Sequence, residues 1–280
     1  MPSSNHLYFF LDHTLWDFDR NSAESLTEIY HHFELVNHGV LSLGDFVRTF
    51  IEVNTQLWND FDQGRINHSY IREHRFRLAF EALGLANVPF GGDLGEEYLR
   101  LLPQKAHLLD GAVALLDYCA NKDYQLHIVT NGFDSIQASK MQSSGIHHYF
   151  QQVVTNEKAQ AKKPDARIFA YALQAAGALP NESLMIGDNW EADIMGALRF
   201  GIDAAFYNPK KLTFGQKPTY DIQHLDELSS VVREGRGWIT KITDTLLSTA
   251  DQHVFLSLRQ LSYLWPNVLK INGNSTFEVF

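Results

Sequence analysis

The sequence of 280 residues predicts an α/β fold, a Rossmann-like core with a parallel sheet and an inserted block of α-helices. Short apolar runs recur along the chain, and each one ends in polar or glycine residues. Runs of this kind are typical of buried strands. From the second run onward they alternate with helical stretches, which indicates right-handed crossovers between parallel strands. A long helical segment separates the first run from the second.

The predicted strands lie at residues 7–12, 125–132, 151–157, 183–189 and 203–208. Three helices are predicted between them, at 135–145, 165–177 and 191–201. They end at Gly145, Gly177 and Gly201, where a left-handed residue commonly closes a helix. Ligands of such sheets bind beyond the carboxyl ends of the strands, so functional residues are expected there.

The insertion, residues 19–102, is predicted to be helical throughout, and residues 1–18 and 103–228 form the core domain. Its helices are expected at 21–39, 43–61, 67–84 and 92–102. Apolar residues recur in it at helical spacing. A block inserted directly after a strand end is well placed to act as a lid over a site. A packing domain without a gating role is the alternative.

Residues 229–280 form a C-terminal extension of unknown role, with a possible helix at 251–265. The formal net charge of −10 disfavours a nucleic-acid or acidic-membrane partner. The single cysteine, Cys119, lies in an apolar helical stretch and cannot form an internal disulfide. The start of the chain shows no signal peptide, and no stretch has the length of a membrane span. A cytoplasmic protein is therefore expected.

Polar residues follow four of the predicted strands or their loops in a consistent order. Phosphoryl transfer requires a nucleophile, an acid/base, donors for phosphate oxygens and a divalent cation. Oxygen-rich ligand sets favour Mg²⁺ over Zn²⁺. Each residue alone also suits a helix cap, a turn or a solvated surface, but their order, spacing and strand context together favour a phosphate site. The set comprises Asp12, Thr14, Thr130, Asn131, Gly132, Lys163, Asp188 and Asp193.

The chain resembles the haloacid dehalogenase superfamily. The resemblance is carried by these residues, by the segments "DHTLWDF" and "NGF", and by the helical insertion. The resemblance covers residues 7 to about 228 and is to the phosphatase branch with a helical cap, especially to noncanonical pyrimidine 5′-nucleotidases. It implies a core of the haloacid dehalogenase type with a cap domain. It makes Asp12 the general acid/base and a backbone ligand of Mg²⁺. It assigns phosphate binding to Thr130, Asn131, Gly132 and Lys163, and metal binding to Asp188 and Asp193. It also makes Lys163 a catalytic residue that steadies the charge of the nucleophile and the phosphate.

The implied function is Mg²⁺-dependent hydrolysis of a small phosphorylated metabolite through an aspartyl-phosphate, with a nucleoside 5′-monophosphate as the expected substrate. Sugar phosphates and acylneuraminate phosphates are the alternative substrates. A dehalogenase is disfavoured because it does not need the paired acidic residues of a magnesium site. A monomer or a homodimer is expected.

The nucleophile is the part of the family pattern that the sequence lacks. The family places an aspartate two residues before Asp12, where this chain has Phe10. In one hypothesis phenylalanine replaces the nucleophile, and the protein is an inactive relative that binds phosphate. In the other, which we favour because the rest of the site is intact, an aspartate between Phe10 and Leu11 is missing from the printed sequence.

Three further residues are candidate substrate contacts, namely His13, Trp16 and Trp190. His13 lies inside the catalytic loop, and the tryptophans could stack on a nucleobase. Aromatic residues of this kind also pack a protein core, which is the alternative.

Overall fold

The computed structural model describes residues 6–85, 88, 91–232, 269–271 and 277–279. The chain divides into two compact units, residues 1–229 and 230–280. In the second unit the described residues form an antiparallel pair, β7 (Leu269–Ile271) and β8 (Phe277–Val279). The helix predicted at 251–265 lies outside the described residues. Within the described part of the chain, no helix is both long and apolar enough to cross a membrane.

The first unit contains a six-stranded parallel sheet in the order β3-β2-β1-β4-β5-β6, which confirms the predicted fold class. The last strand was not predicted from the sequence. The observed strands end earlier than predicted, because the polar residues after them leave the sheet and bond to side chains. The strands are β1 (His6–Phe9), β2 (Gln125–Thr130), β3 (Phe150–Thr155), β4 (Ser183–Gly187), β5 (Asp203–Tyr207) and β6 (Tyr220–Ile222).

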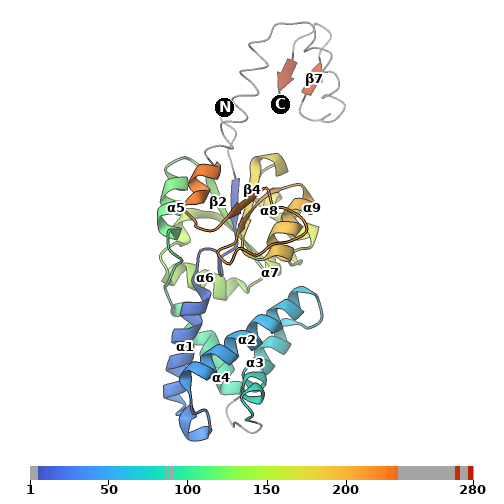
Figure 1. Ribbon diagram of the computed structural model, residues 1–280. Helices are drawn as coiled ribbons and strands as arrows, with labels where there is room; N and C mark the ends of the chain where they lie inside the picture. The colour runs from blue at the N-terminus through green and yellow to red at the C-terminus, as the bar shows by residue number, and fades with distance from the viewer. Residues whose placement is uncertain (1–5, 86–87, 89–90, 233–268, 272–276, 280) are drawn as a thin grey trace. The chain divides into compact units, whose positions relative to one another are not determined.

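Helices cover both faces of this sheet, and in Figure 1 α5 lies on one side while α8 and α9 lie on the other. Side chains of α8 and α9 pack with one face of the sheet in a buried apolar cluster that includes Tyr8, Val129 and Met185. Gly145, Gly177 and Gly201 have the left-handed backbone conformation predicted for them. The helices are α5 (Ala112–Ala120), α6 (Asp134–Ser143), α7 (Asn156–Ala159), α8 (Ala166–Ala176) and α9 (Gly196–Phe200), with 3₁₀ turns at His147–Tyr149 and Pro180–Glu182 and a π-helical turn at Trp190–Met195.

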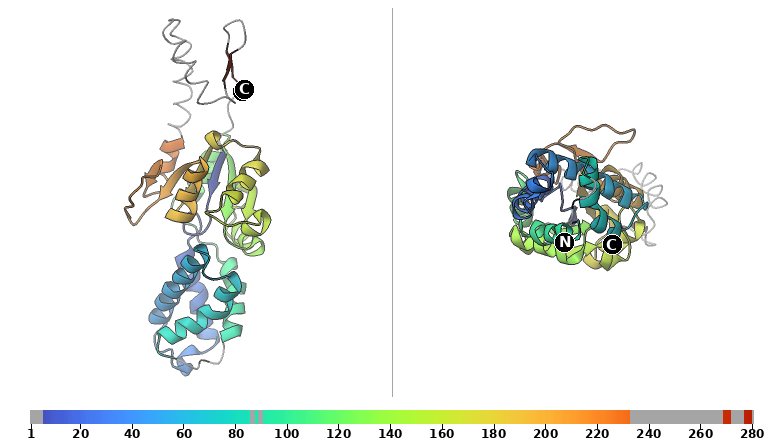
Figure 2. Two further views of the ribbon diagram at one scale, coloured as in Figure 1. Left: turned by 90° about the vertical axis from the view of Figure 1, so that its right-hand side faces the viewer. Right: turned by 90° about the horizontal axis from the view of Figure 1, so that it is seen from below.

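The insertion between β1 and β2 folds into four helices, which we call the helical block (Figure 2). Its first three helices begin at side-chain caps: Asp17, Ser42 and Asn67 each accept a hydrogen bond from a backbone N–H of the first turn. Each helix packs against two others, so the block encloses an interior. The elements are α1 (Phe18–His32), α2 (Leu43–Asp62), α3 (His68–Ala82) and α4 (Gly91–Leu101), with 3₁₀ turns at Leu35–His38 and Leu102–Gln104.

Strand β1 lies at the centre of the sheet, between β2 and β4. The chain goes from β1 to β2 on one side and returns to β4 on the other, so the crossover direction changes at β1. A topological switch point of this kind leaves a crevice at the carboxyl ends of the strands, where ligands of α/β sheets bind. Most of the predicted site residues follow these three strands, whereas Lys163 lies between α7 and α8.

Two buried histidines from neighbouring strands make the sheet sensitive to acid. His6 Nδ1 lies 3.0 Å from His127 Nε2, and the ring of His127 stacks on Tyr8. Burial lowers the pKa of His127 from 6.5 to about 4, with nearby His6 adding to the effect, and burial also lowers the pKa of His6. The folded state therefore binds fewer protons than the unfolded chain between these pH values.

We expect the free energy of unfolding to be highest above pH 6.5 and to fall as the pH drops towards 4, by about 3 kcal/mol through His127 alone. Urea unfolding at a series of pH values measures this. His127→Leu should reduce the slope, whereas replacing the exposed His147 with glutamine should leave it unchanged. An unaltered slope in His127→Leu would contradict the assignment.

Candidate active site

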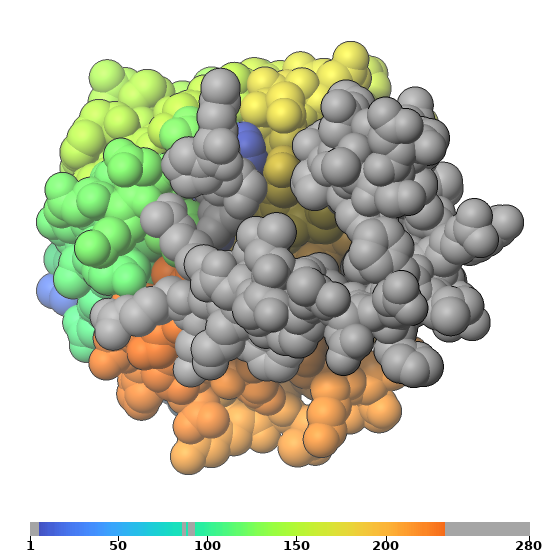
Figure 3. Space-filling view, turned by 90° about the horizontal axis from the view of Figure 1, so that it is seen from above, coloured from blue at the N-terminus to red at the C-terminus, as the bar shows by residue number. Residues whose placement is uncertain are grey.

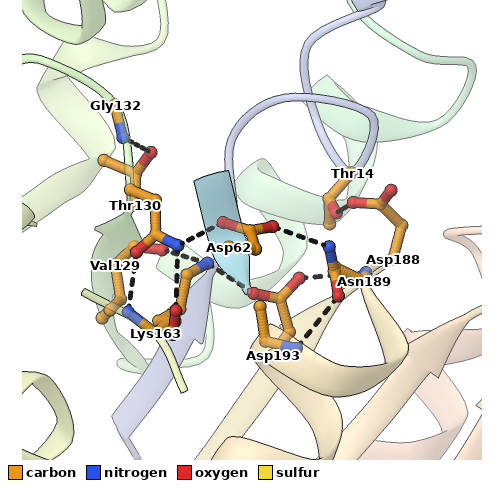
Figure 4. A network of polar contacts seen from close by, with 11 residues as sticks. Thr14, Asp62, Val129, Thr130, Gly132, Lys163, Asp188, Asn189 and Asp193 are labelled. Carbon is orange, nitrogen blue, oxygen red and sulfur yellow. Dashed lines mark hydrogen bonds and ion pairs between the residues drawn. The ribbon is translucent and has the colours of Figure 1, made fainter. Parts of the chain in front are cut away.

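The residues that follow β1, β2 and β4 meet in one polar network (Figure 4). Asn131, just after β2, binds the backbone of Lys163 twice: its Oδ1 accepts from Lys163 N at 2.7 Å, and its Nδ2 donates to Lys163 O at 3.1 Å. Thr130 Oγ1 accepts from Gly132 N at 3.1 Å. Hydrogen bonds therefore hold the segment after β2 and the segment around Lys163 together, and both were assigned to phosphate binding.

Lys163 is fully buried, in contrast to an ordinary solvated lysine before a proline. Its Nζ donates to Val129 O at 3.0 Å and pairs with Asp193, whose side chain has no exposed surface. Asp193 lies in the π-helical turn, a feature common at functional sites. A side chain at Gly187, the last residue of β4, would collide with Asp193, so the glycine allows this close approach.

Asp188 follows β4 and accepts a hydrogen bond from Thr14 Oγ1 at 2.9 Å. This bond joins the loop after β1 to the loop after β4. Burial, and to a smaller degree the carboxylate of Asp193, raises the pKa of Asp188 to about 6. Both effects disfavour an additional negative charge here, and a cation would relieve them.

Asp12 is held by two side chains of α6 that sequence reasoning missed. Lys140 Nζ donates to Asp12 Oδ1 at 2.6 Å and Gln137 Nε2 donates to Oδ2 at 3.0 Å. Burial acts to raise the pKa of Asp12, but the Lys140 ammonium and Gln137 outweigh it and lower the pKa. Asp12 is thus kept as a carboxylate, the form that serves as a general base. Gln137 and Lys140 are three residues apart on one face of α6, but nothing in the sequence around them indicates what they contact.

Asp62, at the end of α2, is a third residue that the sequence did not reveal. Its carboxylate accepts from Asn131 Nδ2 at 3.1 Å and from Asn189 Nδ2 at 3.3 Å, and burial raises its pKa. An acidic group of the helical block thus occupies a hydrogen bond of Asn131 that the resemblance assigns to phosphate. The position of Asn189 could have been recognised from the sequence, because asparagine is a common N-cap residue and Asn189 caps the turn that begins at Trp190.

Phe10 continues β1 in register, with its N–H donating to Ile186 O at 2.8 Å. Its ring is partly buried and packs against the apolar cluster behind the site. The ammonium of Lys163 lies 3.8 Å from the centre of this ring. With the printed sequence, an aromatic face therefore lies against the lysine that would steady a nucleophilic carboxylate.

The three candidate substrate contacts lie in different surroundings. His13 is in the left-handed backbone region (φ 58°), with its side chain 43% exposed beside Asp19. Trp16 is fully buried, and its ring faces the Lys140 ammonium at 4.5 Å. Trp190 stacks on Phe214 at 4.2 Å. Phe214 belongs to the segment between β5 and β6, which is coloured orange on the surface in Figure 3. Of the three side chains, His13 is the exposed one, and it lies within the catalytic loop.

The acidic residues present do not complete a magnesium site. Asp193 is already paired with Lys163, and Asp188 is bonded to Thr14. Among the described residues, no group of three or more histidine, cysteine or acidic side chains is placed to hold a metal ion. Mg²⁺ requires near-octahedral oxygen coordination, commonly with carboxylates. The family resemblance expects a further carboxylate at the end of β1, where this chain has Phe10.

Known proteins are similar to this chain in sequence and in fold. The family model for haloacid dehalogenase-like hydrolases matches residues 86–207. Pyrimidine 5′-nucleotidase PynA of Streptococcus pneumoniae is 35% identical over 225 residues, which is 79% of this chain and 92% of that protein. Pyrimidine 5′-nucleotidase YjjG of Escherichia coli is 30% identical, over 81% of this chain and 96% of that protein.

A solved structure shares the architecture as well. The crystal structure of the putative HAD-hydrolase YfnB from Bacillus subtilis, bound to magnesium, matches with a TM-score of 0.72 and 26% identity, over 82% of this chain and 99% of that one. The similarity to the two nucleotidases extends over almost their whole length. The chain belongs to the haloacid dehalogenase-like hydrolases, a family of enzymes.

Proposed function

We propose that this protein hydrolyses pyrimidine nucleoside 5′-monophosphates to the nucleoside and inorganic phosphate. The observation that supports this most strongly is that Asp12, Asn131 and Asp188 follow three adjacent strands, β1, β2 and β4, and that Asn131 binds the backbone of Lys163. The two nucleotidases similar to this chain give the substrate class. The helical block is proposed to be the cap, because its Asp62 reaches the phosphate-binding residues.

Phosphate binding is assigned to the hydroxyl of Thr130, the amide of Asn131 and the ammonium of Lys163. Three carboxylates, of Asp62, Asp188 and Asp193, lie around that single ammonium. A phosphate dianion would be repelled by this excess of negative charge. Turnover is therefore proposed to depend on Mg²⁺, and the binding of this ion on an aspartate at the end of β1.

The reaction needs a nucleophile and a residue that moves protons. In the proposed chemistry an aspartate beside Phe10 attacks phosphorus, and the bond from phosphorus to the nucleoside O5′ breaks as Asp12 gives that oxygen the proton that it took from water in the preceding turnover. Asp12 then takes a proton from water, which attacks the aspartyl-phosphate and releases phosphate and the free carboxylate. Lys140 favours the carboxylate form of Asp12 that this second step requires.

In the chain that carries an aspartate between Phe10 and Leu11, Asp12→Asn should lower the rate of phosphate release from UMP by at least about 100-fold, because an amide cannot exchange the proton. The matched control is Asp19→Asn, the same chemical change at an exposed position seven residues further on. Steady-state phosphate release at saturating UMP measures both. Undiminished activity in Asp12→Asn would refute the role of Asp12.

One observation favours a second function, the binding of a phosphorylated ligand without catalysis. The ring of Phe10 lies against Lys163 at the position where a nucleophile is needed. A protein of this kind would be stabilised by nucleotides and sugar phosphates yet release no phosphate from any of them. Thermal unfolding and phosphate release over the same ligand panel distinguish the two functions.

A further inference from the structure

The end of α2 and the start of α3 contact residues beside the sheet. Lys162 donates a hydrogen bond to the backbone oxygen of Phe61, and its ammonium lies 3.8 Å from the centre of the Phe61 ring. The ring of His68 contacts those of Phe61 and Phe133, at distances of 4.1 and 4.2 Å between ring centres. We call these contacts, together with the hydrogen bonds of Asp62, the seam.

Asp62 is the acidic residue of the seam, and each oxygen of its carboxylate accepts one hydrogen bond. Asn131 Nδ2, after β2, donates to Oδ1 at 3.1 Å, and Asn189 Nδ2, after β4, donates to Oδ2 at 3.3 Å. Figure 4 shows the carboxylate between the residues of these two loops. Because Asn131 is proposed to bind phosphate, Asp62 uses a donor of the proposed ligand site.

The carboxylate of Asp62 and a phosphate group also share the same attracting charge. Burial raises the pKa of Asp62, whereas Asn131 and the ammonium of Lys163 act against the rise because they favour the ionised form. Lys163 is proposed to bind phosphate, so it would attract both anions. Like charges that lie close together in a partly buried site repel each other strongly. A phosphate dianion at Lys163 therefore disfavours the ionised Asp62 beside it.

Asp62 differs from the other two carboxylates around Lys163 in the element that carries it. Asp188 and Asp193 belong to the segment after β4, and they are held by Thr14 and by Lys163 itself. Asp62 belongs to the helical block and is joined to the loops of the site by hydrogen bonds to two neutral amides. A displacement of the end of α2 would remove this one charge and leave the other two in place.

We propose that Asp62 competes with the phosphate group of the substrate for the candidate active site. Asp62 binds Asn131 and Asn189 when the site is empty, and it gives up these bonds when phosphate enters. Its return to the two amides favours the release of the inorganic phosphate that the reaction forms. This assignment rests on the proposed function and extends it, since it names a residue that weakens phosphate binding.

A purely structural role for Asp62 predicts a different result. If Asp62 only joined the helical block to the loops of the site, its loss would loosen those loops. Phosphate would then bind equally well or more weakly. Competition predicts tighter binding once the charge is removed, so the sign of the change in affinity separates the two roles.

Calorimetric titration with inorganic phosphate tests the proposal without requiring turnover. We expect Asp62→Asn, which keeps the shape of the side chain but not its charge, to bind phosphate at least about 10-fold more tightly than the unaltered chain. Asp62→Ala should change the affinity in the same direction, and Asp62→Glu, which keeps the charge, should not tighten binding. The control is Asp45→Asn, the same change of net charge at the first turn of α2, where the side chain is 50% exposed.

Each outcome decides a specific point. Equal or weaker phosphate binding by both Asp62→Asn and Asp62→Ala overturns the competition, while phosphate binding by the unaltered chain leaves the proposed function in place. Equal tightening in Asp45→Asn attributes the effect to net charge and also overturns the competition. Phosphate binding by Asp62→Asn but not by the unaltered chain supports it. Absence of phosphate binding in all of these chains overturns both the competition and the proposed phosphate site.

Discussion

Inserting an aspartate between Phe10 and Leu11 of the printed chain is expected to raise phosphate release from UMP, in the presence of Mg²⁺, on the order of 10⁶-fold, the scale of losing a covalent nucleophile. The printed chain has no carboxylate that can form the aspartyl-phosphate at the end of β1. The ammonium of Lys163, which is proposed to steady the nucleophile, already lies 3.8 Å from the centre of the Phe10 ring. Steady-state assays of the two chains measure the difference.

The register of the sheet explains why an insertion, rather than a substitution, is expected to restore activity. Phe9 lies opposite Ile128 of β2 and Ile186 of β4. Counted two residues on from these residues, position 11 corresponds to Thr130, the last residue of β2, and to Asp188, which follows β4. An inserted aspartate takes this position, whereas Phe10→Asp would place its carboxylate one residue lower.

Two variants control for other effects of the insertion. An inserted asparagine has the same length and shape but no nucleophilic carboxylate, so it should remain inactive. Phe10→Asp should be less active than the chain with inserted aspartate. If Phe10→Asp is the more active of the two, phenylalanine has replaced the nucleophile in this protein, and the omission hypothesis is wrong.

The second large effect concerns stability. Lys163→Met should lower the free energy of unfolding by about 3–5 kcal/mol, because it leaves the carboxylate of Asp193 buried without its ammonium partner. Removal of one partner of a buried ion pair is far more costly than loss of a surface pair. Urea unfolding at neutral pH measures the change.

Two further chains make this prediction specific to the ion pair. Lys210→Met removes an exposed lysine and should change the free energy of unfolding by less than about 0.5 kcal/mol. Adding Asp193→Leu to Lys163→Met removes the buried charge and should recover much of the loss. A loss below about 1 kcal/mol in Lys163→Met would show that Asp193 does not depend on this lysine.

The sequence was sufficient for the sheet and its order of elements because each strand and helix carries its own periodicity and end signals. Runs such as "SLMIG" and helix ends such as Gly177 are local features. The end of β2 was predicted too far along the chain, because Asn131 and Gly132 form hydrogen bonds with Lys163 and with the Thr130 side chain rather than with a neighbouring strand. The short strand β6 pairs only with β5 and has little apolar pattern of its own.

The residues of the site also divide into those that a local pattern reveals and those that it does not. Asp188 and Asp193 were found because their spacing after a strand is itself a pattern, and the structure links them to Thr14 and Lys163. Asp62 and Lys140 were missed because their importance comes from contacts with residues 69 and 128 positions away. Periodicity does not encode contacts of that range. Nor does it show that Trp190 is stacked on Phe214 rather than facing a ligand.

The central claim is that an aspartate at the end of β1 makes this protein a phosphatase, and the covalent sequence around Phe10 tests it most directly. In the printed sequence the first lysine or arginine is Arg20, so trypsin releases a peptide that ends there and spans the strand end. Tandem mass spectrometry of this peptide, from protein isolated from its own source, reads the residues in order. The account predicts an aspartyl residue, free or modified, between Phe10 and Leu11. A fragment series in which Leu11 follows Phe10 directly would contradict it and leave the binding function in its place.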